Sequence, residues 1–329
     1  MKKFLIIQTA SIGDVILATP LIEKIHHSFR DAVIDFLVKK GMEGLFTEHP
    51  IIHELLVWDK SKRKYRNFRD LVPKIRKNRY DIVINIQRFT ATGILTVLSG
   101  AKTTIGFKKN PLSLFFTKRI THIIGNGMHE VQRNLELFDD TTASGRVRPK
   151  LYPTEAATIK IVPYKTAQYY TISPASLWFT KQLPAEKWIE FIKRIDPTFR
   201  IYFLGSAQDK SFCDRIIQSS GNPGSVNLAG KLSFLESAAL MKDAKMNFTN
   251  DSAPMHLASA VNAPVTVIYC STVPAFGFGP LSDQSHIVET KEQLDCRPCG
   301  LHGFSQCPEK HFKCALTISP DQLTARLQS

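Results

Sequence analysis

The 329-residue sequence has no run of about 18 consecutive apolar residues, the length that a membrane-spanning helix requires. It lacks the G-x-G-x-x-G fingerprint of dinucleotide-binding folds and the Walker pattern G-x-x-x-x-G-K-[ST], so hydrolysis of ATP at a P-loop is not indicated. It also has no internal repeat of fixed period. We therefore expect neither a membrane-spanning helix nor a repeat architecture.

Acidic residues are scarce, with 29 Asp and Glu against 43 Lys and Arg, which gives a net charge of +14. Residues 1–160 carry 27 basic and 15 acidic residues (+12), whereas residues 161–329 carry 16 and 14 (+2). A balance this basic indicates an acidic partner such as nucleic acid, a membrane surface or a phosphorylated substrate. The first half of the chain should contact that partner.

The composition, 43% hydrophobic and 22% charged, is that of a globular protein large enough for two domains. The apolar run Phe4–Ile7 stops at Gln8 and has no cleavage site after it, so we interpret it as a first buried strand rather than a signal peptide. We expect a cytoplasmic protein, in which the six cysteines are thiols or metal ligands rather than disulfides.

Short apolar strands alternate with amphipathic helical stretches along most of the chain, the pattern of parallel sheets covered by helices. The helices include one predicted over Asp14–Phe29. Residues 139–168 have little periodicity and the composition of a linker. The sequence thus predicts two doubly wound, Rossmann-like α/β domains facing a cleft, over residues 1–160 and 161–329. The predicted strands are Phe4–Gln8, Ala32–Val38, Tyr80–Asn85, Tyr169–Ile172, Arg200–Leu204, Lys245–Thr249 and Pro264–Tyr269.

Three strand-to-helix turns carry residues suited to an anionic ligand: Gln8–Asp14, Ser173–Lys181 and Asn250–His256. Carboxyl ends of parallel strands are where ligands bind in such sheets, and a helix start attracts phosphate. Each turn also has a plain structural interpretation. Asp14 can serve the helix dipole, Lys181 can be a solvated charge, and the third turn can be an ordinary cap with a packed histidine.

A cysteine-rich tail, residues 296–314, has the spacing C-x-x-C-x7-C-x6-C. Four such ligands can close a structural zinc site, but reduced thiols or a redox pair fit the same spacing. The four cysteines are Cys296, Cys299, Cys307 and Cys314. Cys213 and Cys270 lie in apolar segments, where buried packing is expected.

The stretch Lys60–Arg79 holds ten Lys or Arg and one opposing acid, Asp70. It is either a solvated helix face or an amphipathic basic helix for a membrane surface or an acidic substrate. Nucleic acid is a further possibility, although no recognition motif accompanies the charge. The same charge continues in Lys102, Lys108, Lys109, Lys118 and Arg119.

Three segments, Ser11–Pro20, Asn227–Lys231 and Asn250–Ala260, together resemble motifs of glycosyltransferase family 9, the bacterial heptosyltransferases of the lipopolysaccharide inner core. The resemblance implies the two-domain GT-B fold and inversion of configuration without a catalytic metal. The sequence departs from the family pattern at Ala253, where glycine is usual, and at Cys270–Thr272.

The resemblance also implies roles for single residues. Asp14 matches the general base, Ser176 and Lys181 match residues that hold the phosphates of the donor, and Asp209 matches the acid that binds the nucleoside. Leu232 lies near that nucleoside site. The residues that match the loop gripping the diphosphate and sugar are Asp251, Ser252, Ala253 and His256.

From these observations we expect a cytoplasmic glycosyltransferase, peripheral to the inner membrane, that moves heptose from ADP-heptose to an anionic, lipid-linked saccharide and requires no cofactor. The first domain would bind the acceptor and the second the nucleotide sugar. Two alternatives stay open. One is a transferase or epimerase that uses another nucleotide sugar, and the other is a non-catalytic basic module that binds membrane or nucleic acid.

Overall fold

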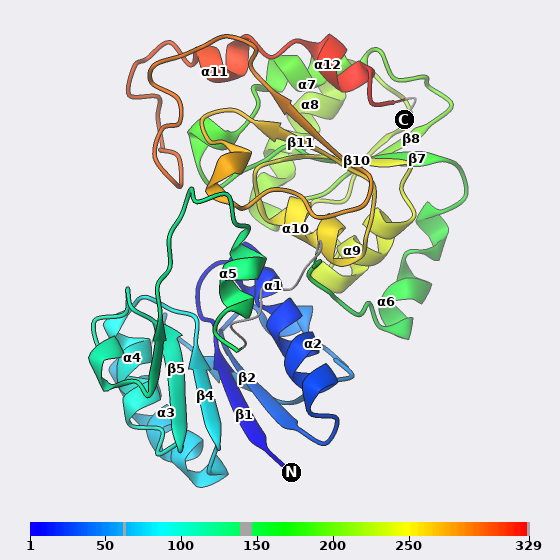
Figure 1. Cartoon of the computed structure of the whole chain (residues 1–329). Coiled ribbons are helices and arrows are strands. Elements are labelled where there is room, and N and C mark those ends of the chain that lie inside the picture. Colours follow the sequence, from blue (N-terminus) through cyan, green and yellow to red (C-terminus); the bar gives the residue numbers. More distant parts are fainter. Residues whose placement is uncertain (62–63, 139–146, 328–329) are drawn as a thin grey trace. The chain divides into compact units, whose positions relative to one another are not determined.

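The computed structural model describes residues 1–61, 64–138 and 147–327. The chain divides into two compact units, Met1–Tyr152 and Pro153–Ser329. Each unit contains one six-stranded sheet whose strand pairs are all parallel, with helices against it (Figure 1). The expectation of two doubly wound α/β domains is confirmed.

The sheet of the first unit has the strand order β3-β2-β1-β4-β5-β6. Because the order reverses between β1 and β4, their carboxyl ends form the switch point at which doubly wound sheets bind ligands. The strands are β1 (Lys3–Ile7), β2 (Val33–Lys39), β3 (Ile52–Trp58), β4 (Ile82–Asn85), β5 (Thr103–Phe107) and β6 (Lys118–Ile120).

Helices cover both faces of this first sheet (Figure 1). Helices α3 and α4 pack together on one face, where Leu71 and Ile75 join the core residues of β1 and β2. Helices α1, α2 and α5 pack with one another on the other face. The helices are α1 (Ile12–Leu17), α2 (Thr19–Ser28), α3 (Lys64–Asn78), α4 (Thr90–Val97) and α5 (Glu130–Leu135), and a 3-10 turn, η2, spans Ser113–Phe115.

The sheet of the second unit has the order β12-β11-β10-β7-β8-β9, so its switch point lies between β7 and β10. Its core gathers 23 buried residues, among them Trp188, Phe191 and Phe248. The strands are β7 (Tyr169–Ser173), β8 (Arg200–Phe203), β9 (Ser225–Asn227), β10 (Met246–Asn250), β11 (Val265–Tyr269) and β12 (Ser285–Glu289).

Helices of the second unit form two groups. Helices α6 and α10 contact α9, whereas α8 and α12 contact α7. The helices are α6 (Glu155–Lys160), α7 (Ala185–Ile192), α8 (Lys210–Ser220), α9 (Phe234–Lys242), α10 (Ala253–Ala260), α11 (Lys313–Leu316) and α12 (Pro320–Thr324), with 3-10 turns η4 (Phe179–Lys181) and η5 (Ala207–Asp209).

Two local expectations were wrong. The helix predicted over Asp14–Phe29 is broken at Ala18, because Pro20, the second residue of the next helix, α2, has no amide hydrogen to continue the first helix. The linker predicted over residues 139–168 contains α6, which the side chain of Thr154 caps. Its segment 139–146 lies outside the described residues, and the second compact unit begins at Pro153.

Candidate functional site

Asp14 lies in the first turn of α1, directly after the carboxyl end of β1. It forms a capping box with Ser11: its Oδ2 accepts hydrogen bonds from the Ser11 hydroxyl at 2.6 Å and the Ser11 amide at 3.1 Å. The structural interpretation of Asp14 therefore holds, and the half-buried carboxylate also lies at the β1–β4 switch point.

A lysine from the basic stretch is held beside the same turn. Lys60 donates hydrogen bonds from Nζ to the carbonyl of Thr9 at 3.0 Å and to its hydroxyl at 2.9 Å. The ammonium group also lies over the Trp58 ring, 4.5 Å from its centroid. The rest of the stretch, as predicted, forms a helix, α3, with Leu71 and Ile75 buried against the core.

A cavity of about 430 Å³ opens in the first unit, at the carboxyl ends of β5 and β6. Lys108 follows β5 directly, Thr121 follows β6, and the Lys108 amide donates to the carbonyl of Ile120 at 2.8 Å. The lining combines three cations and one carboxylate with apolar and neutral polar side chains. Its residues are Lys108, Arg119, Ile120, Thr121, Ile123, Asn126, Met128, Arg133 and Glu136.

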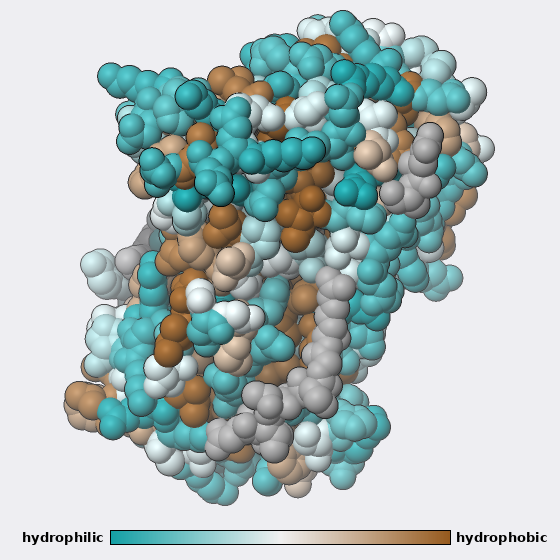
Figure 2. Space-filling view, turned by 45° about the horizontal axis from the view of Figure 1, so that its top comes forward, coloured by the Kyte–Doolittle hydropathy of each residue, from teal (hydrophilic) through white to brown (hydrophobic). Residues whose placement is uncertain are grey.

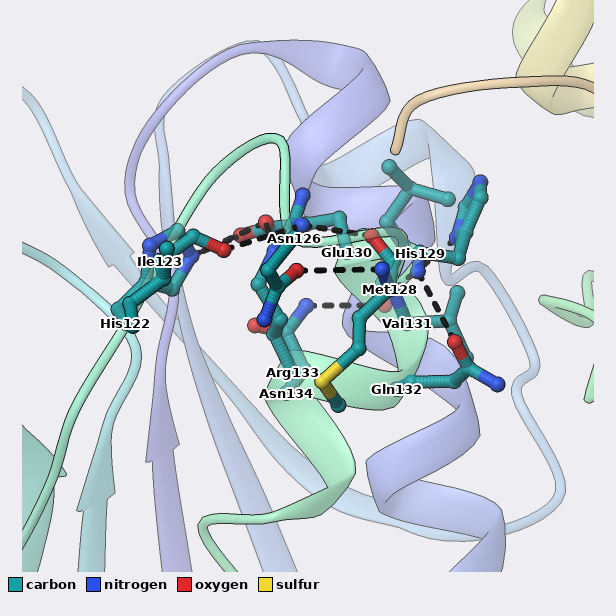
Figure 3. Close-up of polar contacts among 11 residues, drawn as sticks. His122, Ile123, Asn126, Met128, His129, Glu130, Val131, Gln132, Arg133 and Asn134 are labelled. Carbon is teal, nitrogen blue, oxygen red and sulfur yellow. Dashed lines mark hydrogen bonds and ion pairs between the residues drawn. The ribbon is translucent and has the colours of Figure 1, made fainter. Parts of the chain in front are cut away.

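Arg133 is a fixed, almost fully buried wall of this cavity (Figure 3). Its Nε donates to Glu130 Oε2 at 2.8 Å, and a terminal nitrogen donates to the Met128 carbonyl at 2.6 Å. Glu130 also contacts Nε2 of His122 at 3.0 Å. Burial raises the pKa of Glu130, but hydrogen bonds and charge from His122 and Arg133 outweigh it and hold that pKa below its usual range.

Lys109 connects this cavity electrostatically with the turn of Asp14. The pKa of Lys109 lies below its ordinary value, mainly because burial desolvates the ammonium group. The charges of Arg133 and Arg88 lower it further, whereas those of Glu130 and Asp14 raise it. All four charges therefore lie within electrostatic range of one ammonium group. Acidic and basic groups therefore lie together at the carboxyl edge of the first sheet.

In the second unit, Lys181 and Asp251 form an ion pair at the β7–β10 switch point. Nζ of Lys181 lies 2.6 Å from Oδ2 of Asp251, and the two side chains are 15% and 10% exposed. The hydroxyl of Thr272, on the turn after β11, donates to the same oxygen at 2.6 Å. The interpretation of Lys181 as a solvated charge was therefore wrong.

Asn250 joins the turns after β7 and β10. Its side-chain amide donates to the carbonyl of Pro174 at 2.8 Å, and its Oδ1 accepts from the Leu183 amide at 3.0 Å. Gln182 accepts from the amide of Ser176 at 3.1 Å, which holds that half-buried serine within the same loop.

The start of α10 follows Asp251 directly. Ser252 occupies the N-cap position, but its side chain makes no capping bond and instead donates to the carbonyl of Asn250 at 3.4 Å. Ala253 and Pro254 begin the helix, and His256 is buried within it. The amides of the first turn therefore receive no side-chain cap from Ser252, an arrangement suited to an external anion.

Asp209 forms a capping box of the same kind as that of Asp14. Its Oδ2 accepts hydrogen bonds from the amide and hydroxyl of Ser206, at 2.7 and 2.8 Å, in a capping box after β8. The turn that carries the half-buried Leu232 lies next to it, because the Gly230 amide donates to the Gly205 carbonyl at 2.9 Å. The second sheet thus brings its predicted site residues to one edge, on neighbouring turns.

The four tail cysteines are free and form no disulfide. Within the described ranges, no group of three or more His, Cys, Asp or Glu is arranged to hold a metal ion. Cys296 Sγ lies 3.8 Å from Nε2 of His311. Burial raises the pKa of Cys314 to about 12 and that of Cys299 above its ordinary value, so both are protonated thiols at neutral pH. Cys213 and Cys270 are buried, as expected.

Sequence reasoning missed the residues that support the Lys181–Asp251 pair. Thr272 lies in the segment Cys270–Thr272 and Arg297 in the cysteine-rich tail, but neither was given a role in this site, and Asn250 and Gln182 were not given roles either. Strand β11 brings Thr272 to the site, and the return of the tail brings Arg297. No local signal would have identified Arg297.

The sequence profile of glycosyltransferase family 9 (heptosyltransferase) matches residues 68–305. Lipopolysaccharide heptosyltransferase 3 of Escherichia coli is 27% identical, over 79% of this chain and 81% of that protein. The structure of E. coli ADP-heptose lipopolysaccharide heptosyltransferase II superposes with a TM-score of 0.80 at 19% identity, over 100% and 99% of the two chains. E. coli heptosyltransferase WaaC with ADP has a TM-score of 0.75 at 19% identity, over 99% of each.

These likenesses extend through both units. The fold agrees with that of the solved heptosyltransferases, and the family profile covers more than half of the chain, including the Lys181 and Asp251 turns. The chain therefore belongs to glycosyltransferase family 9, the heptosyltransferase family.

Proposed function

We propose that the protein is an inverting heptosyltransferase that moves heptose from ADP-heptose to the lipid-linked inner core of lipopolysaccharide. One observation carries the proposal: each sheet places a charged constellation at its switch point, Asp14 in the first unit and the Lys181–Asp251 pair in the second. Membership of the family and the nature of the solved relatives support the choice of donor.

The second unit is proposed to bind ADP-heptose. Lys181 and the amides at the start of α10 would receive the diphosphate, with Ser176 beside them. The bound diphosphate would compete with Asp251 for Lys181. Asp209 is placed to accept ribose hydroxyl groups, and Leu232 lies on the adjoining turn to pack against the nucleoside.

The reaction is proposed to be a single displacement. Asp14 takes the proton of the acceptor hydroxyl while the oxygen attacks the anomeric carbon of the heptose. The bond from that carbon to the phosphate oxygen breaks, its electron pair stays on ADP, and configuration inverts. Lys181 and the helix amides would neutralise the charge that builds on ADP, the task that a metal ion performs in other transferases.

The first unit is proposed to bind the anionic acceptor. The cavity at β5 and β6 has the volume of a small-ligand site and carries Lys108, Arg119 and Arg133 in its lining. Lys60 adds a cation beside the Asp14 turn. Apolar residues such as Ile123 and Met128 complete the lining, which suits the carbon–hydrogen faces of a sugar.

The acceptor is lipid-linked, so we further propose peripheral contact with the inner face of the cytoplasmic membrane. Across the described segments, no helix is long and apolar enough to cross a bilayer. The exposed side of α3 carries Arg66, Arg69 and Arg76, and on η2 two large apolar side chains, Leu114 and Phe115, are 74% and 69% exposed. On the face drawn in Figure 2, hydrophobic residues reach the surface between hydrophilic ones.

Calorimetric titration of the full chain with ADP, ADP-heptose and UDP tests the donor. We expect ADP and ADP-heptose to bind and UDP to bind far more weakly. Absence of binding by both ADP ligands would remove the donor assignment. Analysis of the product made from ADP-heptose and inner-core acceptor then separates transfer from epimerisation, since an epimerase releases a free nucleotide sugar and forms no glycosidic bond.

A further inference from the structure

Arg297, in the tail, makes more contacts than any role as a surface charge requires. Its Nε donates to the carbonyl of Cys270 at 2.8 Å, and one terminal nitrogen lies 2.9 Å from the carbonyl of Thr272 and 3.3 Å from that of Tyr269. The same nitrogen lies 2.7 Å from a carboxylate oxygen of Glu289 on β12. The side chain is 11% exposed.

This guanidinium group therefore donates hydrogen bonds to backbone carbonyl groups at the end of β11 and in the turn after it. A planar guanidinium presents several donors in fixed directions, so it can hold successive carbonyl groups in a single geometry. Glu289 balances its charge, which lowers the cost of its burial. The turn from Tyr269 to Thr272 is thus fixed by a side chain that comes from a different part of the chain.

The fixed turn leads directly to the proposed donor site. The carbonyl of Thr272 accepts from Arg297, while the hydroxyl of Thr272 donates to Oδ2 of Asp251 at 2.6 Å. That oxygen is the one paired with Lys181. Three short contacts in series thus join Arg297 to the lysine proposed to receive the diphosphate.

The tail also holds the turn of Lys181 itself. The Cys299 amide donates to the carbonyl of Ser271 at 2.8 Å, and the hydroxyl of Ser271 donates to that of Thr180 at 3.1 Å. The Phe304 amide donates to the Thr180 hydroxyl at 2.7 Å, and its carbonyl accepts from the Thr180 amide at 3.1 Å. Residues 297–304 therefore fasten both sides of the Lys181–Asp251 pair.

We propose that Arg297 is a positioning residue for the diphosphate site: it fixes the turn of Thr272, which holds Asp251 and through it Lys181. The inference rests on the proposed function, because it takes a diphosphate as the ligand of that site. It assigns the tail a task in donor binding that needs no metal ion.

The test compares ligands with and without phosphates on the full chain. Arg297→Gln and Thr272→Val are expected each to weaken ADP binding about tenfold, within the range of couplings seen between residues of one network. Adenosine, which lacks the diphosphate, should bind each variant as it binds the wild type. The matched control is Arg194→Gln, which removes a surface arginine of the same unit that pairs with Asp321.

A double-mutant cycle separates positioning from a merely structural role. If Arg297 acts through Thr272, the double variant binds ADP no more weakly than either single variant. Arg297→Lys keeps the charge with fewer directed donors and should recover only part of the affinity, and Thr272→Val tests the same link if Arg297→Gln does not fold.

Three outcomes contradict the inference: additive losses in the double variant, equal losses for ADP and adenosine, or unchanged ADP binding in Arg297→Gln. A wild type that binds no ADP would instead overturn the proposed function, and this inference with it.

Discussion

Lys181 and Asp251 come from the turns after different strands, yet Nζ and Oδ2 lie 2.6 Å apart at the carboxyl edge of the second sheet. Each is largely buried, so each satisfies the charge of the other while no ligand is bound. A diphosphate that reaches this edge meets a cation already fixed in place. Under the proposed function, donor binding would exchange one anionic partner of Lys181 for another.

Replacement of that lysine tests the exchange. Lys181→Met should lower kcat about 100-fold, the usual loss when one preorganised group that stabilises transition-state charge is removed. ADP affinity should fall as well, because Asp251 then repels the diphosphate. Lys193→Met, on the exposed end of α7, is the control, and equal kinetics for the two variants would contradict the role of Lys181.

The two tasks assigned to Asp14 can be separated by a pair of variants. Asp14→Asn should abolish transfer while ADP still binds, because an amide cannot take the acceptor proton. Ser11→Ala removes the capping hydroxyl but keeps the carboxylate, so it should cost about 1 kcal/mol of stability and retain transfer. Rate assays measure transfer by both variants, and urea unfolding measures their stability. Turnover by Asp14→Asn would exclude Asp14 as the base.

Charge reversal at the cavity of the first unit tests acceptor binding. Arg119→Glu should raise KM for the anionic acceptor at least about tenfold and leave KM for ADP-heptose unchanged, since the loss of one charge-assisted contact is worth about 1.5–3 kcal/mol. Lys102→Glu is the control, because Lys102 precedes β5 and so lies at the opposite edge of the sheet. An equal rise in both variants would indicate only a general effect of charge.

Membrane contact through η2 predicts a loss of vesicle binding on polar substitution. Leu114→Ser/Phe115→Ser should reduce co-sedimentation with vesicles of phosphatidylglycerol and phosphatidylcholine at least about tenfold, because two exposed apolar side chains no longer enter the bilayer. Ile159→Ser, which removes an exposed apolar side chain of the second unit, should bind as the wild type does. If the double variant still sediments fully, η2 is not the contact.

His49 predicts a specific dependence of stability on pH. Burial lowers the pKa of this imidazole to about 4, with a further contribution from Lys150, whereas the ordinary value is 6.5. Between those values the unfolded chain binds a proton that the folded chain does not. Folding free energy contributed by His49 is therefore present above pH 6.5 and is lost as pH falls, by at most about 1.4 kcal/mol per pH unit.

Urea unfolding from pH 7 to pH 5 measures this loss. His49→Asn retains an acceptor for the amides of Ile51 and Ile52 but does not titrate, so its free energy of unfolding should fall less than that of the wild type. His27→Asn, at an exposed position, should follow the wild type. Parallel curves for all three proteins would show that His49 does not titrate as its burial implies.

The parts of the fold and site that the sequence predicted are those encoded locally. The apolar strands, the basic helix α3 and the turns that carry Asp14, Lys181 and Asp251 each leave a signature within about ten residues. The Ser11–Asp14 capping box leaves one too, although the break at Ala18 was missed because hydrophobic periodicity continues across it.

What the sequence did not predict depends on contacts between distant segments. The bond from Thr272 to Asp251 requires β10 and β11 to be neighbours, and the bonds of Arg297 require the tail to return to the end of β11. The spacing of the cysteines left a zinc site, reduced thiols and a redox pair open, and in the described part of the chain no group of three or more His, Cys, Asp or Glu is arranged to hold a metal ion.

The contacts of Thr180 and Thr272 with residues 297–304 can form only after those residues have been synthesised. Lys181, Asp251 and Thr272 leave the ribosome well before Arg297 and Phe304, which come from the last part of the chain. A nascent or truncated chain that ends before Cys296 has every residue proposed to touch the donor but lacks the segment that fastens their turns. By the inference above, such a chain would hold ADP more weakly than the full chain does.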